Sequence, residues 1–196
     1  MQIYWSPRTR SFASLWALEE TGMPYEAVLT DISIGAQKTP EYLAINPMGK
    51  VPALKDGDVT IAESAAIIAY IAERFPAAKL APEIGHPQRG KYLQWMFFAA
   101  NIEAAITQIF TKIEMPTRSA GWGSADQVFD VLDKALETGP WLLGQRFSAA
   151  DIVIGSGLNF AVRAFKMVPP RPSFDRYLDR ISAREAFKAA EKMGAV

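Results

Sequence analysis

The stretch NPMGKVPALKDGDVTIAES, residues 46–64, combines a predicted hairpin with the start of a predicted helix. Two short apolar runs, 51–54 and 59–61, flank a turn that contains Asp56 and Gly57. An Asp-Gly pair between two such runs is typical of a β-hairpin. Glu63 and Ser64 open an apolar-periodic segment, 65–75, that predicts a helix. The free amides at a helix start can hold a carboxylate or a phosphate, although Glu63 and Ser64 also fit ordinary helix capping.

The residues before this stretch predict a small α/β domain. Residues 1–5 place alternate side chains on opposite sides, as a strand does, and residues 25–29 are a second strand candidate. Between them a helix is expected to begin near Ser11 and to end at Gly22. This order predicts a right-handed βαβ unit with parallel strands. With a helical turn at 40–43, the hairpin and the helix at 64–75, the order βαβ–ββα is complete by about residue 75.

The remaining residues predict almost only helices. Prolines and a glycine between 76 and 87 mark a linker, and a long apolar stripe predicts a helix over 88–114. Further helices are expected near 128–136, 152–165, 174–181 and 183–193. Ser148 and Asp151 have the spacing of a capping box before the segment at 152–165, so Asp151 is expected to be structural. Ser182 and Glu185 have the same spacing, which predicts a second cap before the last helix.

The composition excludes several kinds of function. The 196 residues carry 21 basic and 21 acidic side chains, and this balance argues against a general binder of nucleic acid or of anionic membranes. Cysteine is absent, so a disulfide, a cysteine nucleophile and a thiolate metal site are impossible, and a cytoplasmic location is expected. Because His86 is the only histidine, a histidine-based triad or a multi-histidine metal site is not expected either. The amino-terminal residues lack the order of a signal peptide.

Six motifs, in this order and at these separations, resemble the cytosolic glutathione S-transferase superfamily, in a bacterial-type member of unassigned class. They are SPRTRS, LEETGMPYE, NPMGKVPAL, IAESAAIIAYIAERF, SAADI and YLDRISAREAFKAA. The resemblance spans nearly the whole chain. It implies an α/β thioredoxin-like, glutathione-binding domain at 1–76, a linker at 77–87 and an all-α C-terminal domain at 88–196. It also implies a homodimer.

The resemblance implies a glutathione site built on the opening stretch. In this family the bond before the proline of VPAL is cis, so the bond between Val51 and Pro52 is expected to be cis, and the backbone of Val51 is expected to pair with the cysteinyl backbone of glutathione. A trans proline at the start of an edge strand is the alternative. Glu63 and Ser64 occupy the positions that receive the γ-glutamyl group. Lys38 and Lys50 are candidates for the glycyl carboxylate, and both also fit plain surface lysines.

Three side chains are candidates for the residue that activates the thiol. Catalysis needs a hydrogen-bond donor that stabilises the glutathione thiolate and so lowers the pKa of the thiol. The resemblance places Thr9 where serine-type members often have this donor. Ser11 stands at the expected helix start, where its hydroxyl could reach a thiolate or simply cap the helix. Tyr4 has a spacing similar to that of tyrosine-type members and also fits a strand tyrosine in the core.

The function implied is that of a glutathione transferase in detoxification. Its partners would be glutathione, as a substrate, and a hydrophobic electrophilic small molecule, with no metal, no nucleic acid and no membrane. Isomerase, dehalogenase and peroxidase variants use the same fold. The alternative is a non-catalytic glutathione transferase-like module that binds or regulates, and the absence of an unambiguous tyrosine or cysteine donor keeps that alternative open.

Overall fold

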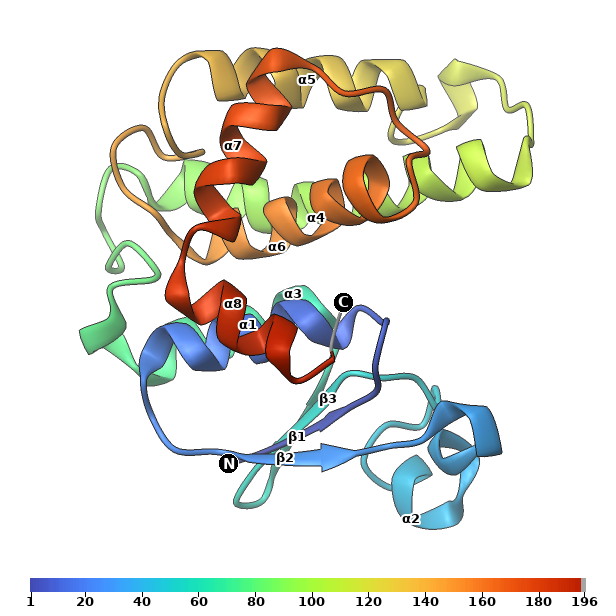
Figure 1. The fold of residues 1–196 in the computed structure, drawn as a ribbon, viewed down its shortest axis with the longest axis vertical. Helices are drawn as coiled ribbons and strands as arrows, with labels where there is room; N and C mark the ends of the chain where they lie inside the picture. Colours follow the sequence, from blue (N-terminus) through green and yellow to red (C-terminus); the bar gives the residue numbers. More distant parts are fainter. Residues whose placement is uncertain (195–196) are drawn as a thin grey trace. The chain divides into compact units, whose positions relative to one another are not determined.

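The structure is a computed structural model that describes residues 1–194. The chain divides into two compact units, which Figure 1 colours along the sequence. The first unit contains Met1–Leu80 and the segment that begins at Ala183, and the second contains Ala81–Ser182. The helical domain expected at 88–196 includes this last segment, which the structure groups with the first unit instead. Residues 195–196 of that expected range lie outside the described residues.

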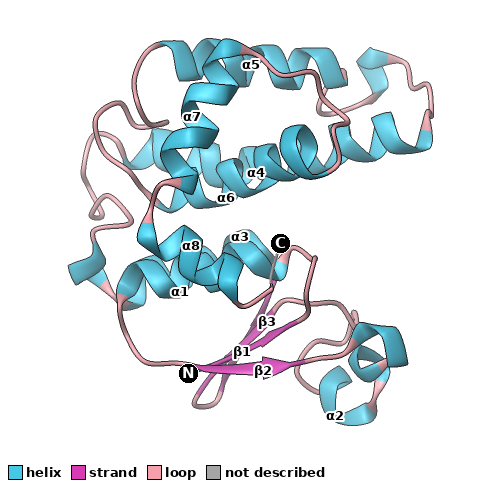
Figure 2. Cartoon of the chain, in the orientation of Figure 1, coloured by secondary structure: helices cyan, strands magenta, loops and turns pink. Residues whose placement is uncertain are grey.

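A four-stranded mixed sheet forms the base of the first unit. Its strands are β1 (Gln2–Trp5), β2 (Glu26–Leu29), β3 (Ala53–Asp56) and β4 (Val59–Ala62), in the order β2-β1-β3-β4. Strand β1 pairs parallel with β2 and antiparallel with β3, and the hairpin pairs β3 with β4 antiparallel. The expected βαβ unit and hairpin are both present. Figure 2 shows the strands as a single sheet.

Four helices complete the first unit: α1 (Ser11–Thr21), α2 (Pro40–Leu43), α3 (Ser64–Arg74) and α8 (Glu185–Lys192). Short 3-10 turns lie at Ile32–Ile34, Ala36–Lys38 and Pro76–Ala78. Helix α1 packs against β1, α3 and α8, and for this reason it is buried from Ser11 to Leu18. Figure 1 shows α8 beside α1. A helix that is apolar nearly all round is typical of such a central position.

The second unit is all-helical, as expected. It contains α4 (Arg89–Thr111), α5 (Ala125–Glu137), α6 (Ala149–Asn159) and α7 (Pro172–Ser182), with a 3-10 turn at Thr117–Ser119. A short π-helix, Phe160–Ala164, follows α6 directly. The helix expected at 152–165 is therefore present, and it changes from α-helical to π-helical hydrogen bonding at Phe160. Helix α6 is almost wholly buried between α4 and α7, which confirms it as the central helix. No helix within residues 1–194 combines the length and apolarity that crossing a bilayer requires.

The two expected caps have different outcomes. Ser148 and Asp151 form a complete capping box at the start of α6. The expected cap at Ser182 is wrong, because α8 begins two residues later than that cap requires, with Arg184 at its N-cap and no side-chain cap. The hydroxyl of Ser182 instead donates to the carbonyl of Asp179, 3.2 Å away in the preceding helix. A serine at a helix end can always return its hydrogen bond to an earlier carbonyl, so spacing alone does not decide a cap.

Candidate functional site

The sheet register brings three segments to one end of the first unit. Tyr4 pairs with Ala53, and Ala53 pairs with Ala62. The residues just beyond these pairs are therefore the loop 6–11 after β1, the Val51–Pro52 bond before β3 and Glu63 after β4. These are the segments that the sequence marked as candidates for binding and activation. The structure thus places the candidate residues of all three along one sheet end.

The peptide bond between Val51 and Pro52 is cis, as the resemblance implied. Val51 is half-buried and Pro52 is buried. Within residues 1–194, neither the amide nor the carbonyl of Val51 has a hydrogen-bond partner. Its backbone therefore presents one donor and one acceptor side by side, which is the pattern that another extended backbone segment needs.

Two residues that the sequence reasoning missed hold this bond in place. The carbonyl of Lys50 accepts hydrogen bonds from the Tyr42 hydroxyl at 2.6 Å and the Asn46 side-chain amide at 2.8 Å. Asn46 is 3% exposed, and its carbonyl oxygen accepts from the Met48 amide at 3.1 Å. Burial, with the neighbouring Tyr4 second, raises the pKa of Tyr42 to about 12, so its hydroxyl keeps its proton. Asn46 opens the NPMG motif, and that position was the available signal.

Only glycine fits at position 49 in this loop. Its φ is +58°, in the left-handed region, and a Cβ there would lie 2.7 Å from the Lys38 Nζ and 2.8 Å from the Gln37 carbonyl oxygen. The same Lys38 Nζ donates to the Met48 carbonyl at 3.2 Å. Lys38 therefore braces the loop before the cis bond while its side chain remains exposed, and Lys50 is exposed as well.

Glu63 and Ser64 stand at the junction of β4 and α3. Glu63 is the N-cap of α3, with φ 69° and ψ 116°, and it makes no side-chain cap. A non-glycine residue held at positive φ is strained, and such strain is concentrated at functional sites. Among the described residues, the Glu63 carboxylate and the Ser64 hydroxyl have no side-chain partner. The junction thus offers one carboxylate, one hydroxyl and the free amides of a helix start.

Thr9 and Ser11 form a small hydrogen-bonded turn after β1. The Thr9 hydroxyl lies 2.7 Å from the Ser6 carbonyl and 2.8 Å from the Ser11 hydroxyl. The Ser11 amide donates to the Thr9 hydroxyl at 3.2 Å, and the Ser6 amide donates to the Ser11 hydroxyl at 3.4 Å. Ser11 is fully buried, whereas Thr9 is half-buried. Arg10, not Ser11, is the N-cap of α1. Thr9 is therefore the more exposed residue of the pair.

The side chain of Tyr4 points away from the loop 6–11. Its hydroxyl donates to the Gln2 side chain at 3.3 Å, toward the beginning of β1, and its ring meets the Tyr42 ring edge-on at 5.9 Å. The loop 6–11 follows the opposite end of the same strand. The hydroxyl of Tyr4 therefore faces away from Thr9 and Ser11 in this structure.

Comparisons with known proteins show to which family the chain belongs. The models of the glutathione S-transferase N-terminal and C-terminal domains match residues 2–73 and 99–180. Glutathione S-transferase hmp2 of Hypomyces subiculosus is 30% identical over 88% of this chain and 89% of its own length. The chain belongs to the glutathione S-transferase family. Like other members of the family, it joins a thioredoxin-like domain to an all-helical one.

Solved glutathione S-transferases share the whole fold. BphK, a bacterial member solved as a ternary complex, has a TM-score of 0.83 and 30% identity, with all of both chains covered. A homologue from Sulfitobacter, solved with bound glutathione, has a TM-score of 0.77 and 26% identity over 100% of this chain and 98% of its own. In the part of this chain that the structure describes, no group of three or more histidine, aspartate or glutamate side chains is placed to hold a metal ion.

Proposed function

We propose that this transferase binds glutathione at the sheet end described above and adds its thiolate to a hydrophobic electrophile. The observation that carries the proposal is the unpartnered backbone of Val51 before a cis bond, beside the unpartnered Glu63 and Ser64. Backbone strain, as at Glu63, and polar backbone groups without partners are typical of ligand-binding sites and are not expected in a protein that binds no ligand. We further propose that it acts in the cytoplasm, in the disposal of reactive small molecules.

Each part of glutathione would meet complementary chemistry. The cysteinyl backbone pairs with the amide and the carbonyl of Val51, as one strand pairs with another. The γ-glutamyl carboxylate accepts from the Ser64 hydroxyl and from the amides at the start of α3, where the helix dipole adds attraction. The Glu63 carboxylate faces the γ-glutamyl ammonium. These contacts fix the tripeptide without using the loop 6–11.

The loop 6–11 would then supply the thiolate donor. We assign this role to Thr9, because it is the more exposed residue of the pair, and we assign support of its hydroxyl to the buried Ser11. The thiol releases its proton to water, and the Thr9 hydroxyl donates to the sulfur left behind. The sulfur lone pair forms a carbon–sulfur bond with the electrophile, whose leaving group departs with its electron pair or whose adduct takes up a proton.

A second candidate function rests on the same turn. The single proton of the Thr9 hydroxyl has acceptors within the protein, the Ser6 carbonyl and the Ser11 hydroxyl. If that proton stays there, glutathione binds without activation, and the chain is a binding or regulatory module. The two functions differ in one measurable property, which is the pKa of the bound thiol.

The test compares Thr9→Val with Thr9→Ser by the ultraviolet absorbance of bound glutathione thiolate. Since a hydrogen bond to a charged group contributes about 1.5–3 kcal/mol, Thr9→Val should raise the thiol pKa by about 1–2 units, and Thr9→Ser should leave it low. Ser11→Ala should raise it less, since Ser11 acts through Thr9. Wild-type protein that is retained on glutathione resin with a thiol pKa as in free glutathione would establish the binding module. Failure to be retained would overturn the proposed function.

We propose, finally, that the protein is a homodimer assembled through α4. Phe97 is 79% exposed and Leu93, one turn earlier on the same helix face, is 39% exposed. Two large apolar side chains exposed one turn apart on the same helix face are typical of a surface that another protein covers. A second copy of this chain is the partner that the proposal names.

A further inference from the structure

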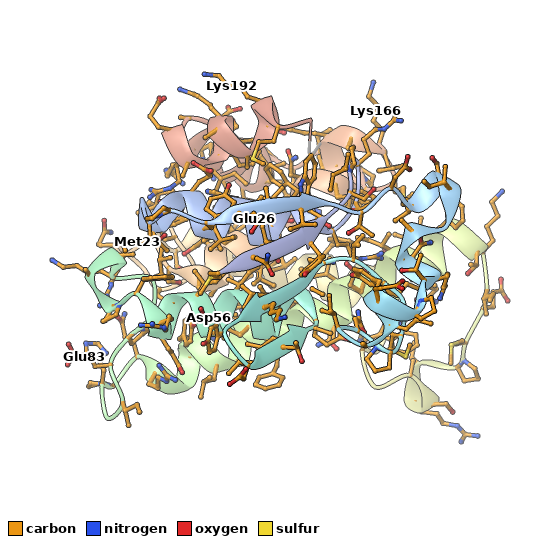
Figure 3. All side chains as sticks on the ribbon, turned by 90° about the horizontal axis from the view of Figure 1, so that it is seen from below. Met23, Glu26, Asp56, Glu83, Lys166 and Lys192 are labelled. Carbon is orange, nitrogen blue, oxygen red and sulfur yellow. The ribbon has the colours of Figure 1, made fainter. Side chains whose placement is uncertain are left out.

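A hollow of about 500 Å³ lies in the first unit, at the end of α1 opposite the glutathione segments. Its walls come from the last turn of α1, the connection to β2 and the end of α8; they include Leu18, Glu19, Met23, Tyr25, Ala27 and Met193. Met23 and Glu26 are labelled in Figure 3. Ser11 and Glu19 are eight residues apart on α1, which puts the hollow about 12 Å along the helix from the loop 6–11. The hollow is therefore separate from the proposed site.

Most of the wall is apolar and adaptable. Met23 and Met193 line it, and Met23 is 47% exposed, so that side of the hollow is open to solvent. Methionine side chains bend to fit a ligand and make favourable contacts with aromatic rings. The Tyr25 hydroxyl lies 3.6 Å from the sulfur of Met193, the residue that follows α8, so these two side chains meet in the wall of the hollow. A small apolar or aromatic group fits such walls.

One carboxylate stands in this wall without a cation. The Tyr25 hydroxyl donates to Glu19 Oε1 at 2.5 Å, which holds the carboxylate in place and leaves Oε2 without a protein partner. Burial first, and this hydrogen bond second, raise the pKa of Tyr25, so the tyrosine stays a donor. Among the described residues Glu19 makes no ion pair, whereas its neighbour Glu20 is paired with Arg184 at 2.5 Å and 2.7 Å. The negative charge at the hollow is thus uncompensated.

We propose that this hollow binds a small arylalkylamine in its protonated form. The ammonium group would donate to Glu19 Oε2 and lie against the Tyr25 ring, and the aryl group would lie between Met23 and Met193. A charge-assisted hydrogen bond and a cation–π contact both favour the charged amine over a neutral or anionic analogue. The site is independent of glutathione.

The experiment uses the full chain with ¹³C-methyl methionine, whose methyl signals report on seven residues. Phenethylamine, phenethyl alcohol and phenylacetate are titrated in turn at pH 7. Since so small a ligand binds with a dissociation constant on the order of 1 mM, phenethylamine should saturably shift the Met23 and Met193 signals and leave that of Met48 unchanged. The alcohol should bind about fivefold more weakly, and phenylacetate should not bind.

Two variants complete the test. Glu19→Gln keeps a carbonyl that accepts from Tyr25 and removes the charge, so it should weaken phenethylamine binding about fivefold. Glu191→Gln removes a charge from an exposed position on α8 outside the hollow and should leave binding unchanged. Equal binding of the three probes, unchanged binding to Glu19→Gln, or no saturable shift would each overturn the proposal. Retention on glutathione resin, measured on the same samples, reports separately on the proposed function.

Discussion

At the scale of the residue, Asp151 shows how burial and hydrogen bonding compete. Its carboxylate is fully buried and accepts from the Leu142 amide and the Ser148 amide, both at 2.9 Å. The hydroxyls of Ser148 and Tyr177 add two donors at 3.2 Å. Burial nevertheless dominates, and it raises the pKa of Asp151 from 3.8 to about 6. The side chain of Asp151 therefore links the start of α6 to Leu142, Ser148 and Tyr177. Burial makes the charged form of this side chain unfavourable.

The sign of the resulting pH dependence follows from this shift. Because the folded-state pKa is higher than the unfolded one, the contribution of Asp151 to the free energy of unfolding is fully present below about pH 4 and falls as the pH rises through about 6. The fall amounts to about 3 kcal/mol. Asp151→Asn cannot titrate, so the wild-type free energy of unfolding minus that of the variant should fall between pH 4 and pH 7. Urea denaturation across that range measures it.

The control for this prediction is Asp126→Asn, which removes an exposed carboxylate from α5 in the same unit. This variant should keep the wild-type pH dependence. A constant difference between wild type and Asp151→Asn from pH 4 to pH 7 would show that burial does not control this carboxylate. Asp151→Asn should be less stable than wild type at every pH, because its amide group cannot accept both sets of hydrogen bonds.

At the scale of the element, α8 shows how a helix far along the sequence becomes part of the first unit. Phe187 meets the rings of Phe12 and Trp16 edge-on, at 4.9 Å and 5.1 Å. Arg184 makes two hydrogen bonds to Glu20, and Trp16 donates to the same carboxylate at 2.9 Å. The helix thus covers α1 with an apolar centre and an ion pair at its beginning.

This packing predicts a large cost for Phe187→Ala. Removing a buried ring leaves a cavity between α1 and α8, so the free energy of unfolding should fall by about 3–5 kcal/mol. Phe110→Ala makes the same substitution at a position that is 71% exposed, and it should change stability by about 0.5 kcal/mol or less. Guanidinium denaturation of the two variants measures both values. Similar losses for the two would contradict the role given to α8.

At the scale of the whole molecule, the exposed face of α4 predicts the oligomeric state. Phe97→Glu places a charge in the proposed interface and should convert the dimer into a monomer in sedimentation velocity. Phe110→Glu is the matched control, because Phe110 lies on the same helix about 140° around its axis from Phe97. Phe110→Glu should sediment as wild type. A wild-type chain that sediments as a monomer at micromolar concentration would disprove the dimer.

Sequence reasoning was strongest where the structure depends on neighbours in the chain. Gly57 and Asp58 form the hairpin turn between the paired residues Asp56 and Val59, Gly22 ends α1 in a left-handed conformation, and Ser148 with Asp151 caps α6. In each case the deciding hydrogen bonds or backbone angles lie within a few residues. The motifs that carry the family resemblance are of this kind, and the family and fold they implied are confirmed.

The candidate site was predictable as a set of segments and not as a set of contacts. Val51, Glu63 and Ser64 were named from their motifs, and the cis bond was expected. The burial of Ser11 and the bracing of Lys50 by Tyr42 and Asn46 were not, because burial depends on which elements cover a residue. Thr9 and Ser11 are equivalent as hydroxyls in the sequence, and only the packing around α1 distinguishes them.

The sequence by itself determined the family, the order of the elements and the segments that meet at the sheet end. Only the tertiary structure decided that α8 belongs to the first unit, that Glu20 is paired with Arg184 and that Glu19 is left beside a hollow. The reason is physical: turns, caps and helical periodicity are short-range, whereas Glu20 and Arg184 are 164 residues apart and meet only after the chain has folded.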